Sequence, residues 1–198
     1  MIPALLLAAG ISRRMGQPKQ LLEWQGQPLV RHVACNVLAA QSVERLVVVI
    51  GAVADEVRTA LAGLGPRLTI AENPDYASGQ ASSLRVGLAA LPTASAAVLV
   101  VLADQPLVTP GLIDHLIAAY RAQPAALALV PTYQGQRGTP TILGCGLFAE
   151  LRELQGDVGA RVVLHRHPDA VCRVAVDDPA VVVDLDTPDA YQKNRNGW

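Results

Sequence analysis

Short apolar runs alternate with segments of helical periodicity along most of this chain. Apolar and β-branched residues form five such runs, at residues 3–8, 46–50, 68–71, 97–102 and 127–131. Between these runs, apolar residues recur at helical spacing over residues 29–40, 55–64, 81–91 and 112–121. Strands that alternate with helices join into right-handed β-α-β units. We therefore predict an α/β fold that is doubly wound, with a mostly parallel sheet and helices on both faces.

The alternation loosens over residues 134–198. A stretch rich in Gly, Thr and Pro at residues 138–141 precedes two short helical segments. Two further apolar runs, at residues 170–176 and 181–185, each predict a strand. We expect this second half of the chain to cap the sheet.

Neither a long linker nor an internal repeat divides the sequence, so we predict one domain over residues 1–198, with halves of about 1–133 and 134–198. Apolar residues make up 51% of the chain and charged residues 17%, a balance that argues against disorder. The net charge of -1 provides no basic field for nucleic acid. No apolar stretch reaches the roughly 20 residues that span a bilayer.

The apolar run at the N-terminus predicts a first strand, because no positive residue precedes it and Arg13, Arg14 and Lys19 follow it directly. We accordingly expect a cytoplasmic protein that has no membrane or nucleic-acid partner. The three cysteines are far apart and outside any C-x-x-C spacing. This favours reduced and mostly buried thiols over a zinc or redox site.

The segment after the first run, residues 7–19 (LAAGISRRMGQPK), combines small residues with basic ones. Gly10 and Gly16 can take backbone dihedrals closed to other residues, and the exposed N–H groups of such a loop bind anions. Arg14 and Lys19 add positive charge. The segment has neither a Walker A sequence nor a G-x-G-x-x-G fingerprint. It predicts a phosphate site of another kind, and a turn with solvated basic side chains is the alternative.

Two segments bring carboxylates to the ends of apolar runs. Asp104 follows the run at 97–102, which should form a buried central strand. Ligands of such sheets bind at the carboxyl ends of the strands, where Mg²⁺ takes one or two carboxylates together with phosphate oxygens. Asp184 and Asp186 share one face if residues 181–185 form a regular strand. A local hydrogen-bonded turn is the alternative role for Asp104.

Three further segments combine turn-forming and polar residues. Residues 73–84 (NPDYASGQASSL) place Ser82 and Ser83 near the start of a predicted helix, where hydroxyls either cap the helix or face a ligand. The glycines of residues 137–140 (RGTP) and 156–161 (GDVGAR) permit a close backbone approach. Taken alone, the last two segments favour surface turns, whereas their occurrence with the other motifs favours an acceptor-binding role.

Together, these segments resemble the motifs of the MobA-like nucleotidyltransferases, which have a Rossmann-like fold. The first loop matches A-A-G-x-S-x-R-M-G-x-x-K. Its Ala-Ala-Gly is similar in particular to the molybdenum cofactor cytidylyltransferases, because the guanylyltransferase relatives have a Gly-Gly type sequence there. The motifs N-P-x-Y-x-x-G-x-x-S-S-L, L-A-D-x-P, G-D-x-G-A-R and D-x-D-T-P follow along the chain.

The resemblance implies a role for each segment. It implies that Arg14, Lys19 and Asp104 act in catalysis, with the two basic residues on the triphosphate. It also implies that Asp104 and Asp186 bind Mg²⁺, with Asp184 as the alternative second ligand. The implied nucleotide-binding residues are Leu7, Ala8, Ala9, Gly10, Ser12, Arg14, Lys19, Ser82 and Ser83. The implied acceptor-binding residues of the second half are Arg137, Gly138, Pro140, Asp157 and Arg161.

By this resemblance, the chain transfers CMP from CTP to the terminal phosphate of molybdopterin, or of its molybdenum-loaded form, and releases pyrophosphate. A molybdenum hydroxylase is then the expected recipient of the dinucleotide cofactor. Two alternatives stay open: a related transferase that uses GTP or a sugar or polyol phosphate, and a chaperone that carries the cofactor without chemistry. The catalytic set favours an enzyme, because delivery alone needs no pair of metal ligands.

Overall fold

The computed structural model describes residues 1–12 and 15–195. In the first half, strands and helices alternate as the sequence predicts. In chain order they are β1 (Ile2–Leu7), the 3₁₀ helix η2 (Lys19–Leu21), β2 (Glu23–Trp24), β3 (Gln27–Pro28), α1 (Leu29–Ala39), β4 (Val43–Ile50), α2 (Ala54–Ala60), β5 (Leu68–Glu72), η3 (Tyr76–Ser78), α3 (Gln80–Ala89), β6 (Ala97–Leu102) and α4 (Pro110–Arg121).

The second half is made of shorter elements. They are β7 (Ala128–Tyr133), β8 (Gln136–Arg137), β9 (Thr141–Gly144), η4 (Cys145–Leu147), α5 (Phe148–Arg152), α6 (Arg161–Leu164), η5 (Pro168–Ala170), β10 (Val171–Ala175), η6 (Pro179–Val182) and α7 (Pro188–Arg195). The five apolar runs of the first half and the run at 170–176 all form strands, so these predictions are confirmed.

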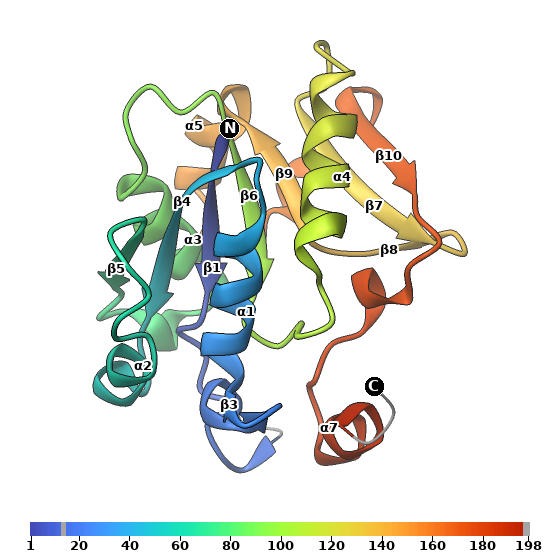
Figure 1. The fold of residues 1–198 in the computed structure, drawn as a ribbon. Helices are drawn as coiled ribbons and strands as arrows, with labels where there is room; N and C mark the ends of the chain where they lie inside the picture. Colours follow the sequence, from blue (N-terminus) through green and yellow to red (C-terminus); the bar gives the residue numbers. More distant parts are fainter. Residues whose placement is uncertain (13–14, 196–198) are drawn as a thin grey trace.

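One eight-stranded sheet organises the molecule, with the strand order β10-β7-β9-β6-β1-β4-β5 and with β8 paired to β7 (Figure 1). The pairs β1–β4, β1–β6, β4–β5 and β7–β10 are parallel. Strand β9 runs antiparallel between β6 and β7. The second half therefore extends the sheet, whereas the sequence led us to expect a cap over it.

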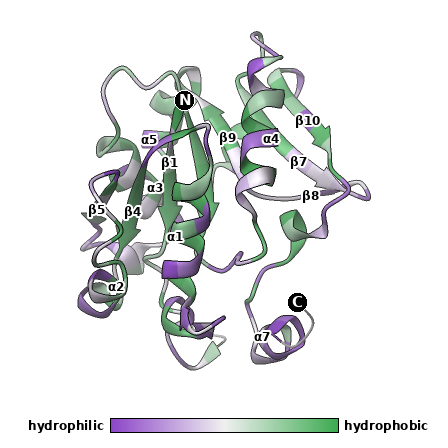
Figure 2. Ribbon diagram, in the orientation of Figure 1, coloured by the Kyte–Doolittle hydropathy of each residue, from purple (hydrophilic) through white to green (hydrophobic). Residues whose placement is uncertain are grey.

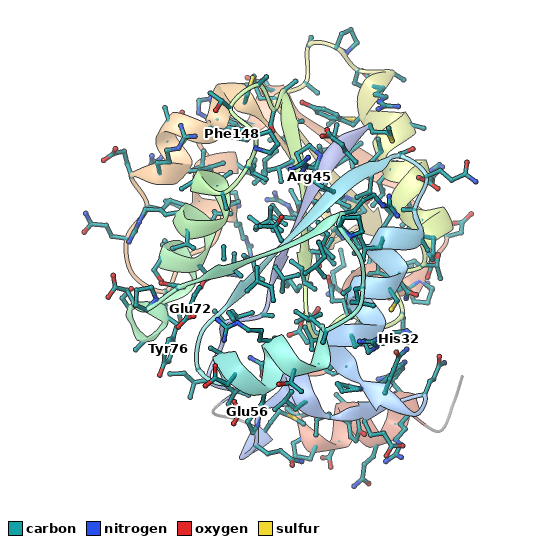
Figure 3. All side chains as sticks on the ribbon, turned by 60° about the vertical axis from the view of Figure 1, so that its left-hand side comes forward. His32, Arg45, Glu56, Glu72, Tyr76 and Phe148 are labelled. Carbon is teal, nitrogen blue, oxygen red and sulfur yellow. The ribbon has the colours of Figure 1, made fainter. Side chains whose placement is uncertain are left out.

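Helices cover both faces of the sheet, which confirms the doubly wound α/β prediction. One apolar cluster packs α1, α2 and α4 on one face, and a second packs α3, α5 and α6 on the other. In Figure 3, Phe148 of α5 and His32 of α1 accordingly lie on opposite sides of the strands. Figure 2 shows the strands as the hydrophobic centre and α7 as a largely hydrophilic helix. None of the helices in the described ranges is long and apolar enough to cross a membrane.

The predicted strand at residues 181–185 is wrong. Pro179 has no N–H to donate to a strand partner, and the carboxylate of Asp178 accepts a hydrogen bond from Ala180 N at 2.9 Å, so a 3₁₀ turn forms instead. Val181 and Leu185 are buried by side-chain packing. Their backbones make single hydrogen bonds to Thr139 and to Asp104. Apolar spacing alone does not distinguish this packing from a strand.

The C-terminal helix packs on the hairpin formed by β2 and β3. The Tyr191 ring lies 6.4 Å from that of Trp24, and the Tyr191 hydroxyl donates to Glu23 O at 2.5 Å. Arg195 forms an ion pair of 2.9 Å with Glu23. Thr187 caps the helix through a 3.2 Å bond from Ala190 N, as its Thr-Pro start predicts.

Asp114 ties α4 to the turn that precedes β4. Its two carboxylate oxygens accept backbone hydrogen bonds from Ser42 at 2.7 Å and from Gln41 at 3.1 Å. Desolvation alone would raise the pKa of Asp114, but these hydrogen bonds outweigh it and hold the pKa below its usual value. Because the folded-state pKa is the lower one, this stabilisation is present above the unfolded-state pKa and is lost as the pH falls through the folded-state value.

We predict that Asp114→Asn lowers the free energy of unfolding at pH 7 by about 1 kcal/mol, because an amide oxygen can replace only one of the two bonds. The difference from the native sequence should shrink as the pH falls below about 4. Urea unfolding at a series of pH values measures both effects, with the exposed Asp177→Asn as control. A difference that stays constant from pH 7 to pH 3 would contradict this account.

Candidate functional site

The loop after β1 is held in shape by one buried glutamine. The Gln20 amide donates hydrogen bonds to Ala8 O at 3.0 Å and to Gly10 O at 2.5 Å. The Ser12 hydroxyl donates to Gln20 Oε1 at 3.2 Å and accepts from Lys19 N at 3.1 Å. The side chain of Gln20 thus links the two ends of the loop. The sequence analysis did not identify this role, because no local pattern marks a buried glutamine.

The loop conformation differs in part from the expectation. Gly16 takes the left-handed φ of +67° that favours glycine, as predicted. The second left-handed residue is Ser12, at φ +57°, whereas Gly10 is not among the residues with positive φ. Arg14, which the sequence assigns to the triphosphate, lies outside the described residues.

Lys19 brings two distant carboxylates together. Its ammonium donates to Asp104 Oδ2 and, at 3.0 Å, to Asp186 Oδ1. Asp104 follows β6, and a backbone hydrogen bond of 3.0 Å from Leu185 N to Asp104 O fixes the segment that carries Asp186 beside it. Residues 19, 104 and 186 therefore meet at the carboxyl ends of β1 and β6.

The two carboxylates stabilise the positive charge of Lys19. Burial by itself would lower the pKa of Lys19, but the adjacent Asp104 and Asp186 outweigh it and raise that pKa. The side chain of Asp104 is only 9% exposed. Its second oxygen, Oδ1, is buried without a hydrogen-bond partner among the described residues. Such an oxygen is a favourable position for a further cation or donor.

Asp184 hydrogen-bonds to Gln105, whereas Asp186 contacts Lys19. Its Oδ1 accepts from the Gln105 amide at 2.8 Å, and Gln105 Oε1 in turn accepts from the Thr139 hydroxyl at 2.6 Å. Burial, and then the negative charges of Asp104 and Asp186, raise the pKa of Asp184 to about 6. Because the expected strand is absent, the alternation rule that placed Asp184 and Asp186 on one face does not apply. Gln105 is a second residue that the sequence analysis missed.

A pocket of about 530 Å³ opens above this cluster. Tyr76, which Figure 3 labels, lines it from the segment between β5 and α3. Among the predicted residues, those that line it are Leu7, Ala8, Ala9, Gly10, Ser12, Lys19, Ser83, Asp104, Asp157 and Asp186. The loop, the lysine and the carboxylates predicted from separate segments thus share one cavity.

The two serines of α3 do not cap the helix, which corrects that interpretation. The helix begins at Gln80, so both serines lie within its first turn. Asn73 Nδ2 donates to Ser82 Oγ at 2.8 Å and to Ser83 Oγ at 3.0 Å. Ser82 does not line the pocket, and its hydroxyl donates within the chain to Gly79 O at 2.8 Å.

Asp157 contacts the start of the same helix. Its Oδ1 accepts a 3.2 Å hydrogen bond from Gln80 N, and a negative charge at this end is stabilised by the exposed N–H groups. Gly79, at φ +112°, packs so closely on residues 156 and 157 that a Cβ would come within 2.5 Å of their backbone. Asp157 therefore lies at the first pocket, whereas the sequence led us to expect it among the acceptor-side residues.

A second pocket of about 470 Å³ adjoins the first, and Leu7, Gln80 and Leu102 line both. Arg137, Gly138 and Arg161, which the resemblance assigns to the acceptor, all line this second pocket. Gly138 packs against Val181, whose carbonyl oxygen would be 2.2 Å from an added Cβ. Pro140 does not line this pocket; it follows a cis peptide bond to Thr139.

The cysteines and histidines lie away from both pockets. None of them is among the described residues that line either cavity. Cys145 is exposed, so the expectation that the thiols are mostly buried is wrong for this residue. His167 contacts Glu150 at 2.6 Å in a surface cluster that also includes Arg166.

We predict that Gln20→Met destabilises the protein by roughly 1–3 kcal/mol, because it leaves the carbonyls of Ala8 and Gly10 without their donor. Amide hydrogen exchange should speed up around residues 8–20 more than in β4. Thermal unfolding and exchange mass spectrometry measure the two effects, and the exposed Gln41→Met is the control. Unchanged exchange in this loop would show that Gln20 does not hold it.

Comparisons with known proteins agree with this geometry. The model of the family of MobA-like NTP transferase domains matches residues 4–171. The chain is 27% identical, over 96% of its length, to the molybdenum cofactor cytidylyltransferase of Escherichia coli K12, 93% of which is covered. It is 33% identical over 94% of its length to the 2-C-methyl-D-erythritol 4-phosphate cytidylyltransferase of Nocardia farcinica, 82% of which is covered.

The fold also matches solved structures over its full length. Rv0371c from Mycobacterium tuberculosis H37Rv superposes with a TM-score of 0.84 at 30% identity, and the alignment covers 100% of both chains. A manganese complex of Rv0371c matches with a TM-score of 0.80 at 29% identity.

Proposed function

The chain belongs to the family of MobA-like NTP transferase domains and is a nucleotidyltransferase, and we propose that it transfers CMP from CTP to the terminal phosphate of molybdopterin or of its molybdenum-loaded form. The observation that carries the transfer chemistry is the cluster of Lys19, Asp104 and Asp186 beneath the pocket formed by the loop after β1. The choice of CTP and molybdopterin is supported by the Ala-Ala-Gly motif and by the Escherichia coli relative.

The donor set fits a divalent cation. Asp104 and Asp186 hold an ammonium between their carboxylates, and Asp104 Oδ1 is buried without a hydrogen-bond partner among the described residues. Mg²⁺ prefers such carboxylates together with phosphate oxygens. We assign Asp104 and Asp186 as its ligands, and the manganese complex of Rv0371c supports a divalent metal in a similar protein. When bound, the metal neutralises negative charge on phosphate oxygens.

The chemistry needs charge neutralisation and alignment more than proton transfer. The acceptor phosphate is ionised at neutral pH, so its oxygen attacks the α-phosphorus of CTP without a general base. The bond from the α-phosphorus to the bridging oxygen breaks, and pyrophosphate leaves with that oxygen. Lys19, together with Arg14, is assigned to neutralise the leaving pyrophosphate. The backbone of residues 7–10 and 12, with Ser83, is assigned to the nucleotide.

The acceptor is assigned to the second pocket. Arg137, Gly138 and Arg161 line it, and it meets the nucleotide pocket at Leu7, Gln80 and Leu102. Two adjoining cavities allow the acceptor and the nucleotide to be bound together, as a direct transfer requires. We also propose that a molybdenum hydroxylase receives the product.

A second candidate is transfer of CMP to a polyol phosphate. The Nocardia farcinica relative, at 33% identity over 94% of the chain, favours it. Both candidates predict CTP as donor and differ in the acceptor. A non-catalytic carrier of the cofactor would release no pyrophosphate with any acceptor.

Product analysis separates these candidates. The protein is incubated with Mg²⁺ and each of CTP, GTP, ATP and UTP, together with molybdopterin or with 2-C-methyl-D-erythritol 4-phosphate. Pyrophosphate release is recorded, and the products are identified by mass spectrometry. We expect a cytosine dinucleotide only from CTP with molybdopterin. If the only product is the cytidine diphosphate ester of the polyol, the second candidate is established instead.

We predict that Asp104→Asn and Asp186→Asn each lower kcat by about a hundredfold or more, while the Kd of CTP changes much less, because neutralisation of phosphate charge matters most in the transition state. Asp184→Asn should have a milder effect, since an amide oxygen can still accept from Gln105. Single-turnover kinetics and CTP titrations measure the two quantities. If Asp184→Asn proves the most severe of the three, Asp184 replaces Asp186 as the second ligand.

We predict that replacing both Ala8 and Ala9 with Gly lowers the preference for CTP over GTP by roughly tenfold. The two residues are 2% and 3% exposed, so their methyl groups pack in the protein and hold the backbone that lines the pocket. The measurement is the ratio of kcat/KM for the two nucleotides, with a thermal melt as a control for folding. A folded variant with the native ratio would move base selection to other residues.

A further inference from the structure

Arginines gather at the second pocket. Arg137 on β8 and Arg161 at the start of α6 line this pocket. Arg173 on β10 does not line the pocket itself; it is exposed beside it, close enough for its charge to act on Arg137 together with that of Arg161. Strands β8 and β10 and helix α6, which are distant in the sequence, thus bring three guanidinium groups close together.

Strand pairing shows that Arg173 faces the pocket side of the sheet. Arg173 pairs with Val130 of β7, and Arg137 pairs with Thr132 two residues further along the same strand. Paired residues, and residues two apart on one strand, point to the same face of a sheet. Val130 itself lines the second pocket. The side chains of Arg137 and Arg173 therefore project on that face, from opposite sides of β7.

The positive charge of these three arginines has no paired carboxylate among residues 1–12 and 15–195. In the described part of the chain, no ion pair and no side-chain hydrogen bond joins any of the three arginines to a protein group. The carboxylate that lines this pocket, Asp184, accepts from Gln105 instead. Desolvation, and then repulsion from Arg173 and Arg161, lower the pKa of Arg137. Like charges gathered at a cavity are typical of an anion-binding site.

Arg173 is too far from the carboxylates to bind the same phosphate. Strand β10 is separated from β6 by β7 and β9, so three strand spacings of about 4.8 Å place Arg173 roughly 14 Å to the side of β6. Asp104 lies beyond the end of β6, which adds to the separation. Between them the pocket has apolar walls that include Leu84, Val100 and Val130.

We propose that Arg137, Arg161 and Arg173 form an anion site at the far end of the second pocket, which binds a negatively charged group of the acceptor other than the phosphate that attacks CTP. The acceptor then has two anionic ends joined by a part that fits apolar walls. The inference deepens the proposed function and rests on it for the statement that the ligand is the acceptor. It adds Arg173 to the binding residues and assigns Arg137 and Arg161 to the far end of the acceptor.

Calorimetric titration with inorganic phosphate as the probe tests the site directly. Arg173→Gln and Arg137→Gln should each raise the Kd of phosphate by roughly tenfold or more, as expected for loss of a charge-assisted hydrogen bond. Arg173→Lys should restore part of the affinity, because it keeps the charge but loses the planar fork. The exposed Arg121→Gln, on the helix that packs on the other face, should match the native protein. The Kd of CTP should be unchanged in all four variants.

A measurement on the native protein locates the bound phosphate. Phenylglyoxal modifies exposed guanidinium groups, and peptide mass spectrometry reports which arginines phosphate protects. We expect protection of Arg137, Arg161 and Arg173 together, and none of Arg121. An unchanged phosphate Kd in Arg173→Gln, or protection that does not include Arg173, overturns the proposal. Normal phosphate binding at these arginines with no product from molybdopterin would contradict the proposed function alone.

Discussion

The ammonium of Lys19 holds two carboxylates that would otherwise repel each other across a poorly solvated space. Asp104 is nearly buried, and leaving it beside Asp186 without a cation would cost several kcal/mol. The contact joins the loop after β1, the end of β6 and the segment before α7, which are far apart in the sequence. This junction lies beside both pockets, because the loop and the end of β6 line the first pocket and the neighbouring Asp184 lines the second.

Backbone hydrogen bonds and helix packing fix the parts that meet at Lys19. Gln20 links the two ends of the loop, and the bond from Leu185 N to Asp104 O fixes the C-terminal segment. The packing of α7 on the hairpin of β2 and β3 then ties the chain beyond Asp186 to the segment after Lys19. In Figure 1 this helix accordingly lies below the sheet, at the same end of the molecule as β3. The site is therefore assembled from three segments that hydrogen bonds and packing hold together.

The sequence predicted the strands and helices of the first half well, because continuous apolar runs are typical of strands buried on both faces. It did not predict that β9 inserts between β6 and β7, since this pairing depends on tertiary packing that leaves no periodic signal. The run at 181–185 had the apolar spacing of a strand but packs without pairing. The motifs identified the loop, Lys19, Asp104 and Asp186. Gln20 was missed because no local pattern marks a buried glutamine, and Gln105 was missed because its partner Asp184 is distant in the sequence.

We propose that Asp104 and Asp186 form a cation site in which Lys19 is the cation of the ligand-free protein. A crystal structure with CTP and Mn²⁺, measured for the anomalous scattering of manganese, tests this proposal. We expect an anomalous peak coordinated by an oxygen of Asp104, an oxygen of Asp186 and the phosphates of CTP, with the Lys19 ammonium moved to the triphosphate. CTP bound in the first pocket with no manganese at these carboxylates, and with Lys19 still between them, would show that the two carboxylates do not bind the metal.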